Sequence, residues 1–483
     1  MFESTAFSTK RIIPIGNEDT GERDGDTSKS RSKSFSDNDT NATVSVTDGG
    51  SSTEEICSAR TPWYSMCFLI LSEVMGTGIL GLPFLAVTLG WTTTMIALPL
   101  FAMIAAYAGF QLRDVKLAYP EITNYADAGK ELIGPKFGLF TKGCMLLNWG
   151  SLAIYFMVAT ANGIEAVYDK GFFSCNLHRM IIAALLLVVP VQARDFHTIS
   201  TYLSLPSTLA IIVTLIIMIV ALVCSLNDGE DDTTSNTFGE DTTAGVMEGT
   251  TVFGFLQALS SIIFAYQGQS IFLELMTEIK DPKNFSKSCN VAYGVMGVVY
   301  TSIVAVAYGI SGDHLTDFLP DILTAGPAKT TVGVLLVFHI LVAYVIAIEP
   351  FHFWLHATAF PNTFRKTSFW GNVHWFIITV GYILFAFVIA NLIPFFGALQ
   401  GLIGSLLGAP IVFGWPSLYY LLTHKNKTCG SWKDTFASIG PINTVISLLF
   451  LFVITPVFMV MGTWGGINDL ITDVGDSGYP FSC

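Results

Sequence analysis

Long apolar runs alternate with short polar segments between residues 64 and 464. A helix needs about 20 apolar residues to cross the hydrocarbon core of a bilayer, and several runs reach that length. The pattern predicts an all-α polytopic membrane protein. Its eleven spanning helices are expected at residues 64–89, 91–112, 138–168, 179–193, 199–226, 251–277, 289–311, 330–350, 372–395, 398–422 and 441–464.

Composition divides the chain into three parts. Residues 1–60 are rich in Ser, Thr, Asp and Gly, which predicts a disordered cytosolic tail. Residues 61–465 form the membrane domain, and residues 466–483 are expected to be a short non-cytosolic tail. About sixty polar residues precede the first span, which argues against a cleaved signal peptide.

The distribution of positive charge predicts how the chain is oriented. If the N-terminus is cytosolic, 21 of the 24 Lys and Arg residues fall on the cytosolic side. The loop at residues 227–250 has seven acids and no Lys or Arg, as expected outside the cytosol. The positive-inside rule therefore favours a cytosolic N-terminus and a non-cytosolic C-terminus.

Two spans contain interruptions at corresponding places. The first carries Gly76, Gly78, Gly81 and Pro83 within eight residues, and the sixth carries Gln-Gly-Gln at 267–269. One explanation is a kinked helix whose glycines only permit close packing. Paired interruptions instead favour an inverted five-plus-five repeat, with broken helices 1 and 6 and one extra C-terminal helix. In such repeats the breaks mark a binding site near the bilayer midplane.

The two breaks would present opposite electrostatic poles. The outer half of helix 1 would begin near Gly78, so its free N–H groups suit a carboxylate. The outer half of helix 6 would end near Phe264 and Ala265, where free carbonyls suit an ammonium group. A free α-amino acid is the simplest ligand that has both charges.

Four motifs resemble those of the amino acid/auxin permease family, within the amino acid–polyamine–organocation superfamily. They occur in order between Tyr64 and Gly462: Gly76-Thr-Gly-Ile-Leu-Gly-Leu-Pro83; Ile122-Thr-Asn-Tyr-Ala-Asp-Ala-Gly129 with Gly134-Pro-Lys; Phe264-Ala-Tyr-Gln-Gly-Gln269 through Glu278–Phe285; and Ile393-Pro-Phe-Phe396 with Gly401-Leu-Ile-Gly-Ser405. The resemblance implies eleven helices, a leucine-transporter-type fold and secondary transport of amino acids coupled to protons or sodium.

The resemblance also implies roles for individual residues. The substrate carboxylate would lie against the segment from Gly76 to Ile79, which includes Thr77 and Gly78. The amine and side-chain wall would comprise Phe264, Tyr266 and Gly268, and ion coupling would involve Ser72 and Glu73. Apart from the resemblance, we expect Tyr155 on helix 3 to contribute to substrate binding and Tyr344 on helix 8 to ion coupling. The carboxylate of Glu73 favours proton coupling and leaves sodium open.

Each of these candidates has an alternative structural interpretation. Glu73 is either a proton carrier or a hydrogen-bonded structural acid. Glu165 and Glu274 are secondary candidates, expected near the outer and inner surfaces. Tyr155 and Tyr344 either reach the cavity or simply pack.

Two further pairs of residues have suggestive spacing or position. His352 and His356 have the i, i+4 spacing of a metal pair, but they lack a third ligand and fall in an expected cytosolic loop. Cys175 and Cys483 both fall outside the cytosol and can form a disulfide, although sequence alone does not establish the pairing.

Other classes of function are less consistent with the sequence. A sensor that reads amino acids with the same pocket remains an alternative. Catalytic motifs of membrane enzymes and charge rings of channels do not stand out. We expect an amino acid substrate, a lipid bilayer, a monomer, no cofactor beyond the coupling ion and no nucleic acid. The membrane is either the plasma membrane or that of a vacuole- or lysosome-like organelle.

Overall fold

The computed structural model describes residues 61–194, 196–228, 238–239, 241–364, 366, 368–393, 395–428 and 430–476. Within these residues the secondary structure is helical, apart from an isolated bridge between Thr61 and Ile279. The predicted tail at residues 1–60 lies outside the described part of the chain, as does most of the predicted C-terminal tail.

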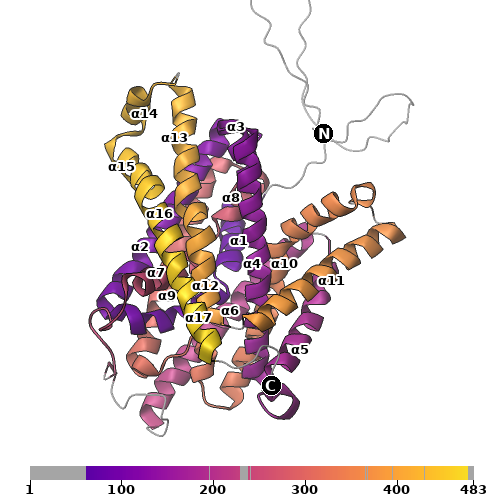
Figure 1. The fold of residues 1–483 in the computed structure, drawn as a ribbon, viewed down its shortest axis with the longest axis vertical. Helices are drawn as coiled ribbons and strands as arrows, with labels where there is room; N and C mark the ends of the chain where they lie inside the picture. Colours follow the sequence, from indigo (N-terminus) through magenta and orange to yellow (C-terminus); the bar gives the residue numbers. More distant parts are fainter. Residues whose placement is uncertain are drawn as a thin grey trace, which may run out of the picture. The chain divides into compact units, whose positions relative to one another are not determined.

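Seventeen α-helices follow one another along the described residues (Figure 1). They are α1 (Trp63–Val74), α2 (Leu82–Ala118), α3 (Tyr125–Leu132), α4 (Pro135–Val167), α5 (Asn176–Val188), α6 (Phe196–Asp228), α7 (Val252–Ala265), α8 (Phe272–Glu278), α9 (Phe285–Ser311), α10 (Pro327–Ala359), α11 (Phe369–Leu392), α12 (Phe396–Ile403), α13 (Trp415–Lys427), α14 (Trp432–Ile439), α15 (Pro441–Leu449), α16 (Thr455–Val457) and α17 (Thr463–Asp476). π-Helical turns at 404–408 and 410–414 connect α12 to α13, and turns at 450–454 and 458–462 connect α15 to α17.

The polytopic membrane class agrees with the helix lengths. Among the described residues, eight helical segments are long and apolar enough to cross a membrane, and there are shorter apolar helices at Trp63–Val74, Asn176–Gln192 and Val252–Ala265. Each predicted span overlaps one of these segments. The count of eleven spans remains a prediction, because the shorter helices do not reach spanning length by themselves.

Gly90 separates the first two predicted spans at a kink within α2, where its own dihedral angles are not helical. Its φ of 69° lies in the left-handed region, which glycine adopts without the penalty that a side chain incurs. A Cβ at this position would also collide with the main-chain oxygen of Gly245. The chain therefore turns between residues 89 and 91, where the apolar pattern placed the boundary.

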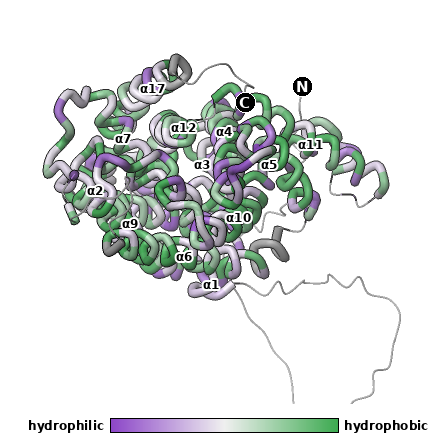
Figure 2. Tube along the Cα trace, turned by 90° about the horizontal axis from the view of Figure 1, so that it is seen from below, coloured by the Kyte–Doolittle hydropathy of each residue, from purple (hydrophilic) through white to green (hydrophobic). Residues whose placement is uncertain are grey.

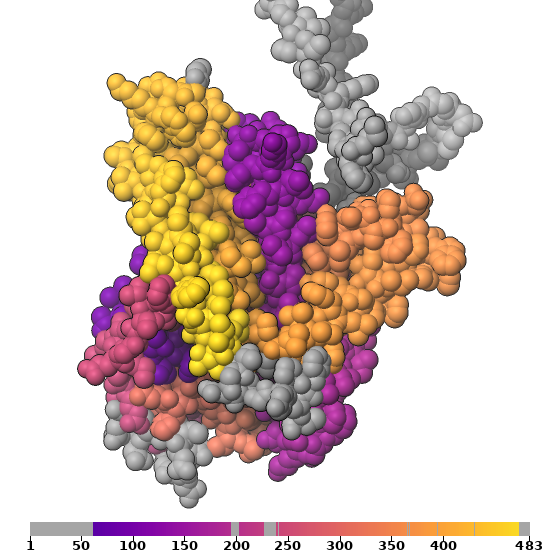
Figure 3. All heavy atoms as spheres, viewed as in Figure 1, coloured from indigo at the N-terminus to yellow at the C-terminus, as the bar shows by residue number. Residues whose placement is uncertain are grey.

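Helix pairing supports the predicted repeat. In such a repeat, α1 corresponds to α7, α2 to α9, α4 to α10 and α6 to α12. The contact of α1 with α9 then has its counterpart in that of α7 with α2, and the contact of α6 with α10 in that of α12 with α4. The contacts of α2 with α9 and of α4 with α10 each join two corresponding helices. All of these helices are in contact. The five-plus-five repeat would produce this pattern, with α15–α17 as the extra element along one side (Figure 3).

Hydrogen bonds join the helix ends near several of the Lys- and Arg-containing segments. Thr61 N–H donates to Glu278 O (2.9 Å), and Lys280 N–H donates to Thr61 O (2.9 Å), which joins the start of α1 to the end of α8. Arg113 at the end of α2 donates to Ser286 at the start of α9. Arg194 donates to Gly371 O (2.7 Å) at the start of α11.

Apolar side chains also cover much of the outside. Met103 on α2, Val298 on α9 and Phe452 near α15 are more than 60% exposed. Hydrophobic residues, in green, occur along many of the helices and are interspersed with more polar ones (Figure 2). An exposed apolar surface of this extent suits hydrocarbon rather than water as the surrounding solvent.

Candidate functional site at the two helix breaks

The first helix is interrupted where the glycines predicted. Helix α1 ends at Val74, Met75 and Gly76 have non-helical dihedral angles, and a 3₁₀ turn follows at Thr77–Gly81 before α2 begins. Gly76 N–H donates to Val74 O (2.8 Å) across the break. The helical segment that follows the break therefore begins at Thr77 and Gly78.

The sixth predicted span is interrupted in the same way. Helix α7 ends at Ala265, and a 3₁₀ turn at Gln269–Ile271 leads into α8. Gly268 between them donates its N–H to the side-chain oxygen of Gln269 (3.1 Å). Both broken helices of the sequence prediction are present.

The two breaks pack directly against each other. A Cβ built on Gly78 would lie 3.0 Å from the Cα of Ala265, which is tight enough that the backbone of Ala265 would have to shift. A Cβ on Gly268 would collide with Val74. Glycine at both positions therefore permits the backbones to approach, which supports the packing explanation, while binding at the same place stays a prediction.

Tyrosine hydroxyls satisfy several main-chain carbonyls at the breaks. The Tyr300 hydroxyl on α9 lies 3.3 Å from Val74 O and 3.2 Å from Ala265 O, one acceptor from each break. The Tyr293 hydroxyl donates to Tyr266 O (3.1 Å). The carbonyl of Ala265, expected to be free, is thus already an acceptor.

A buried amide also connects the breaks to α12. Gln400 Nε2 donates to Gly78 O (2.9 Å) and to Ser261 O (3.2 Å). Its oxygen lies 3.5 Å from the Tyr155 hydroxyl. The sequence analysis did not identify Gln400 and Tyr300. Each is a residue with a polar group inside an apolar run, and that pattern was the sequence feature that could have indicated them.

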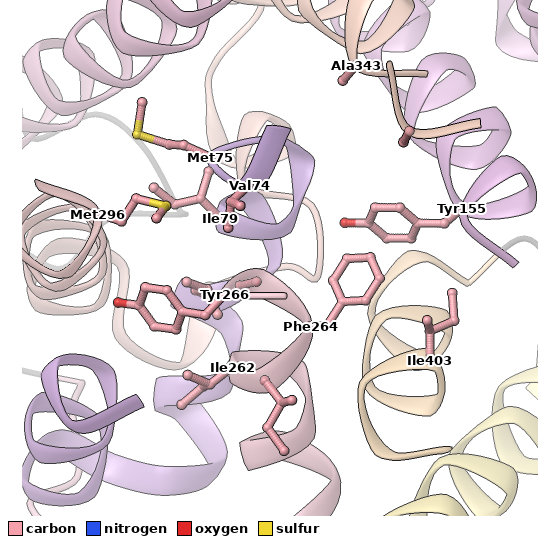
Figure 4. Packing of buried hydrophobic residues seen from close by; sticks show 14 of the residues in the cluster. Val74, Met75, Ile79, Tyr155, Ile262, Phe264, Tyr266, Met296, Ala343 and Ile403 are labelled. Carbon is pink, nitrogen blue, oxygen red and sulfur yellow. The ribbon is translucent and has the colours of Figure 1, made fainter. Parts of the chain in front are cut away.

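Aromatic rings line one side of this region. The Tyr155 ring lies 4.7 Å from the Phe264 ring and 4.7 Å from the Phe396 ring, measured between centroids. Figure 4 shows Tyr155 and Phe264 next to each other, while Tyr266 points away toward Met296. Tyr266 stacks on Tyr300 at 4.9 Å. The structure therefore separates Phe264 and Tyr266, which the sequence analysis had grouped in one wall.

A cavity of about 780 Å³ extends from this region toward the loop before α10. Its lining includes Gly81, Ser261 and Gln400 at the breaks, together with Asp317 and Asp469. Asp317 accepts the N–H of Gly397 (3.0 Å). Burial raises the pKa of Asp317, while that hydrogen bond lowers it by a smaller amount. The lining is mixed, with apolar side chains such as Phe84 and Phe395 beside the two aspartates, and the cavity is large enough for an amino acid.

The candidate ion-coupling residues occupy different environments. Within the described residues, Oε2 of Glu73 is buried and has no hydrogen-bond partner. Ser72 instead bonds within its own helix, to Leu69 O (3.0 Å). Tyr344 on α10 is fully buried, and its hydroxyl has no partner among the described residues. Its ring lies 6.2 Å from that of Phe156, so it packs within the bundle.

The two secondary acidic candidates lie outside the two broken segments. Glu165 near the end of α4 pairs with Arg179 (2.8 Å) on α5. Glu274 lies on α8, beyond the helix 6 break, and is half-buried.

The expected loop at His352 and His356 is not a loop. Helix α10 continues to Ala359, because the run after residue 350 is aromatic and still helix-compatible although less apolar. No group of three or more His, Cys, Asp or Glu residues suited to a metal occurs among the described residues. Cys175 is disulfide-bonded, and its proposed partner Cys483 lies outside the described residues.

Comparison with known proteins identifies the family. Residues 59–460 match the family model described as transmembrane amino acid transporter protein. The chain is 25% identical over 439 residues to Lysine histidine transporter-like 1 of Arabidopsis thaliana, covering 87% of this chain and 91% of that one. It is 26% identical over 446 residues to the N amino acid transport system protein of Neurospora crassa, covering 88% of each. The chain therefore belongs to the transmembrane amino acid transporter family, which is the amino acid/auxin permease family that the motifs indicated.

Proposed function

We propose that this protein is a secondary active transporter that moves free α-amino acids across a membrane by alternating access. The observation that carries the proposal is the contact between the two breaks, where Gly78 lies against Ala265. Unwound backbone inside a membrane domain is stable only when it is buried in protein or lines a polar cavity. Family membership and the adjacent 780 Å³ cavity support the same conclusion.

The substrate would lie across the two poles of the site. Its carboxylate would face the N–H groups of the segment from Gly76 to Ile79, at the positive end of the outer helix. Its ammonium would face the carbonyl end of α7. Ala265 O already accepts from Tyr300, but a carbonyl oxygen has two lone pairs and can accept a second donor. Phe264 and Tyr155 would form the side-chain wall.

Competition by substrate fragments tests this arrangement. Uptake of a radiolabelled amino acid mixture into proteoliposomes should be inhibited by α-amino acids and far less by the matching primary amines or carboxylic acids. A matching amine that inhibits as strongly as the amino acid would contradict the carboxylate cradle. Substituting Gly78 does not isolate the cradle, since any side chain there would press on Ala265.

Proton coupling through Glu73 is the second part of the proposal. Glu73 is half-buried, but its Oε2 is shielded from solvent and has no partner among the described residues, which disfavours the anion relative to the protonated acid. Uptake should therefore be driven by an imposed inward proton gradient, and Glu73→Gln should lose that accumulation. Glu131→Gln is the matched control, because Glu131 is an exposed glutamate on α3 that belongs to neither break. Accumulation that follows a sodium gradient and ignores a proton gradient would overturn the assignment.

A further inference from the structure

A histidine that no sequence motif singles out lies beside the helix 1 break. His339 on α10 is completely buried, with 0% of its surface exposed. A Cβ built on Gly76 would lie 3.4 Å from Nε2 of His339, and no other side chain comes within 4 Å of that position. The imidazole nitrogen therefore faces the unwound main chain, and glycine at position 76 leaves it room.

Hydrogen bonds fix which ring nitrogen is free. Nδ1 of His339 lies 3.0 Å from the main-chain oxygen of Ser207 and 2.9 Å from its hydroxyl. Because a carbonyl oxygen can only accept, we assign the hydrogen to Nδ1. In the neutral ring Nε2 then carries a lone pair. Within the described part of the chain, this buried Nε2 has no hydrogen-bond partner.

A buried acceptor without a donor in a native structure needs an explanation. A metal would need further ligands, and the described residues contain no suitable group of three. A proton needs no further ligand, because a single imidazole nitrogen can hold it. Complete burial disfavours the charged ring, so a bound proton must be stabilised by an acceptor beside Nε2. Once protonated, Nε2–H would need an acceptor, and unwound main chain supplies carbonyls. The main-chain oxygen of Glu73 lies 4.0 Å from the same Cβ position on Gly76.

The helices packed around this position carry several other titratable groups. They are Glu73 on α1, Tyr155 on α4, Tyr300 on α9, and both Tyr344 and the buried Glu349 on α10. Tyr300 is committed to two carbonyls, and Glu165 at the far end of α4 is paired with Arg179. Helix α6 contributes Ser207 as the direct partner. Among the described residues, no acidic side chain forms an ion pair with His339.

We propose that His339 is a proton-binding residue of the transport cycle, located between α6, α10 and the helix 1 break. The inference rests on the proposed transport function and adds a coupling site distinct from the Glu73 carboxyl. The proton binds at Nε2 while Nδ1 keeps its bond to Ser207. Protonation changes Nε2 from an acceptor into a donor toward the break, so proton occupancy alters how α10 holds the unwound segment.

His339→Asn is the appropriate variant, because the asparagine amide can still donate to Ser207 while nothing replaces Nε2. His352→Asn is the matched control. His352 is on the same helix and is also fully buried, but it lies among the rings of Trp375 and Tyr382. Full-length proteins in proteoliposomes would be compared for accumulation under a one-unit pH gradient at clamped potential, and for counterflow without a gradient.

Coupling of one proton to one neutral substrate supports about tenfold accumulation at this gradient. We expect wild type and His352→Asn to approach that value, while the ratio of accumulation to counterflow falls at least fivefold in His339→Asn. An unchanged ratio in His339→Asn would overturn the proton site. Absence of both activities in wild type would instead overturn the transport function itself.

A measurement on wild type keeps the proposal testable if His339→Asn does not fold. Hydrogen–deuterium exchange at the imidazole C2 position, read by mass spectrometry across pH, reports the protonation of each histidine. Adding the amino acid mixture should shift the titration of His339 and leave that of His352 unchanged. A curve for His339 that is unaffected by substrate would contradict its part in the cycle.

Discussion

Removing one hydroxyl tests whether the two breaks act as a single unit. The Tyr300 hydroxyl lies between a carbonyl of each break, 3.3 Å from Val74 O and 3.2 Å from Ala265 O, and the residue is completely buried. Tyr300→Phe removes this donor without changing the shape of the ring. Both carbonyls then lose a partner that water cannot easily replace.

The size of the effect follows from the loss of one donor. The Tyr300 hydroxyl has a single hydrogen, which the two carbonyls share. Leaving a buried carbonyl without that donor costs about 1–3 kcal/mol. Each 1.4 kcal/mol corresponds to about a tenfold change in an equilibrium constant. If the hydroxyl holds the breaks in the arrangement that receives substrate, KM for amino acid uptake should rise about tenfold.

The control is a tyrosine with the same chemistry elsewhere. The Tyr382 hydroxyl on α11 donates to Gly150 O (2.7 Å) on α4, and neither of those helices carries a break. Tyr382→Phe should therefore change KM less than about twofold, which corresponds to less than about 0.5 kcal/mol, even if it lowers thermal stability. Initial rates of uptake should be normalised to the protein reconstituted. A Tyr300→Phe variant with the KM and maximal rate of wild type would refute the reasoning.

Two further perturbations follow from the cavity and its lining. Gln400→Leu leaves Gly78 O and Ser261 O without their amide donor, so uptake should fall strongly. Surface biotinylation should show that the abundance of the variant at the surface is normal. Normal uptake would show that the amide is dispensable. Burial raises the pKa of Asp317 above its ordinary 3.8, so the folded protein binds this proton more tightly than the unfolded chain does. The protonated group therefore contributes its full stabilisation below pH 3.8. That contribution is lost as the pH rises through the folded pKa. Asp317→Asn should flatten the acid side of a plot of melting temperature against pH, and an unchanged slope would contradict that assignment.

Local chemistry was sufficient to predict the breaks. Gly76, Gly78 and Pro83 disfavour a continuous helix, and the polar insert at 267–269 does the same in the sixth span. Both interruptions occur in the structure, within a few residues of where the sequence placed them. The boundary between the first two spans was also predicted, because it coincides with Gly90.

The groups that connect the breaks could not be predicted in this way. A tyrosine in an apolar run has the same local signature whether it packs against a neighbour or donates to a distant carbonyl. Tyr300 therefore becomes recognisable only when α9 lies beside α1. The same holds for His339, which depends on α6 and on the missing side chain at Gly76. The end of α10 was missed because hydropathy falls after residue 350 while the helix continues.

Counterflow tests the central claim without depending on the coupling ion. Proteoliposomes that contain the full-length chain would be loaded with an unlabelled amino acid mixture and diluted into a trace of the labelled mixture, with no ion gradient. Amino acid transport through the breaks predicts a transient accumulation of label that protein-free liposomes lack and that Tyr300→Phe diminishes. Equal label in liposomes with and without the protein would contradict the account.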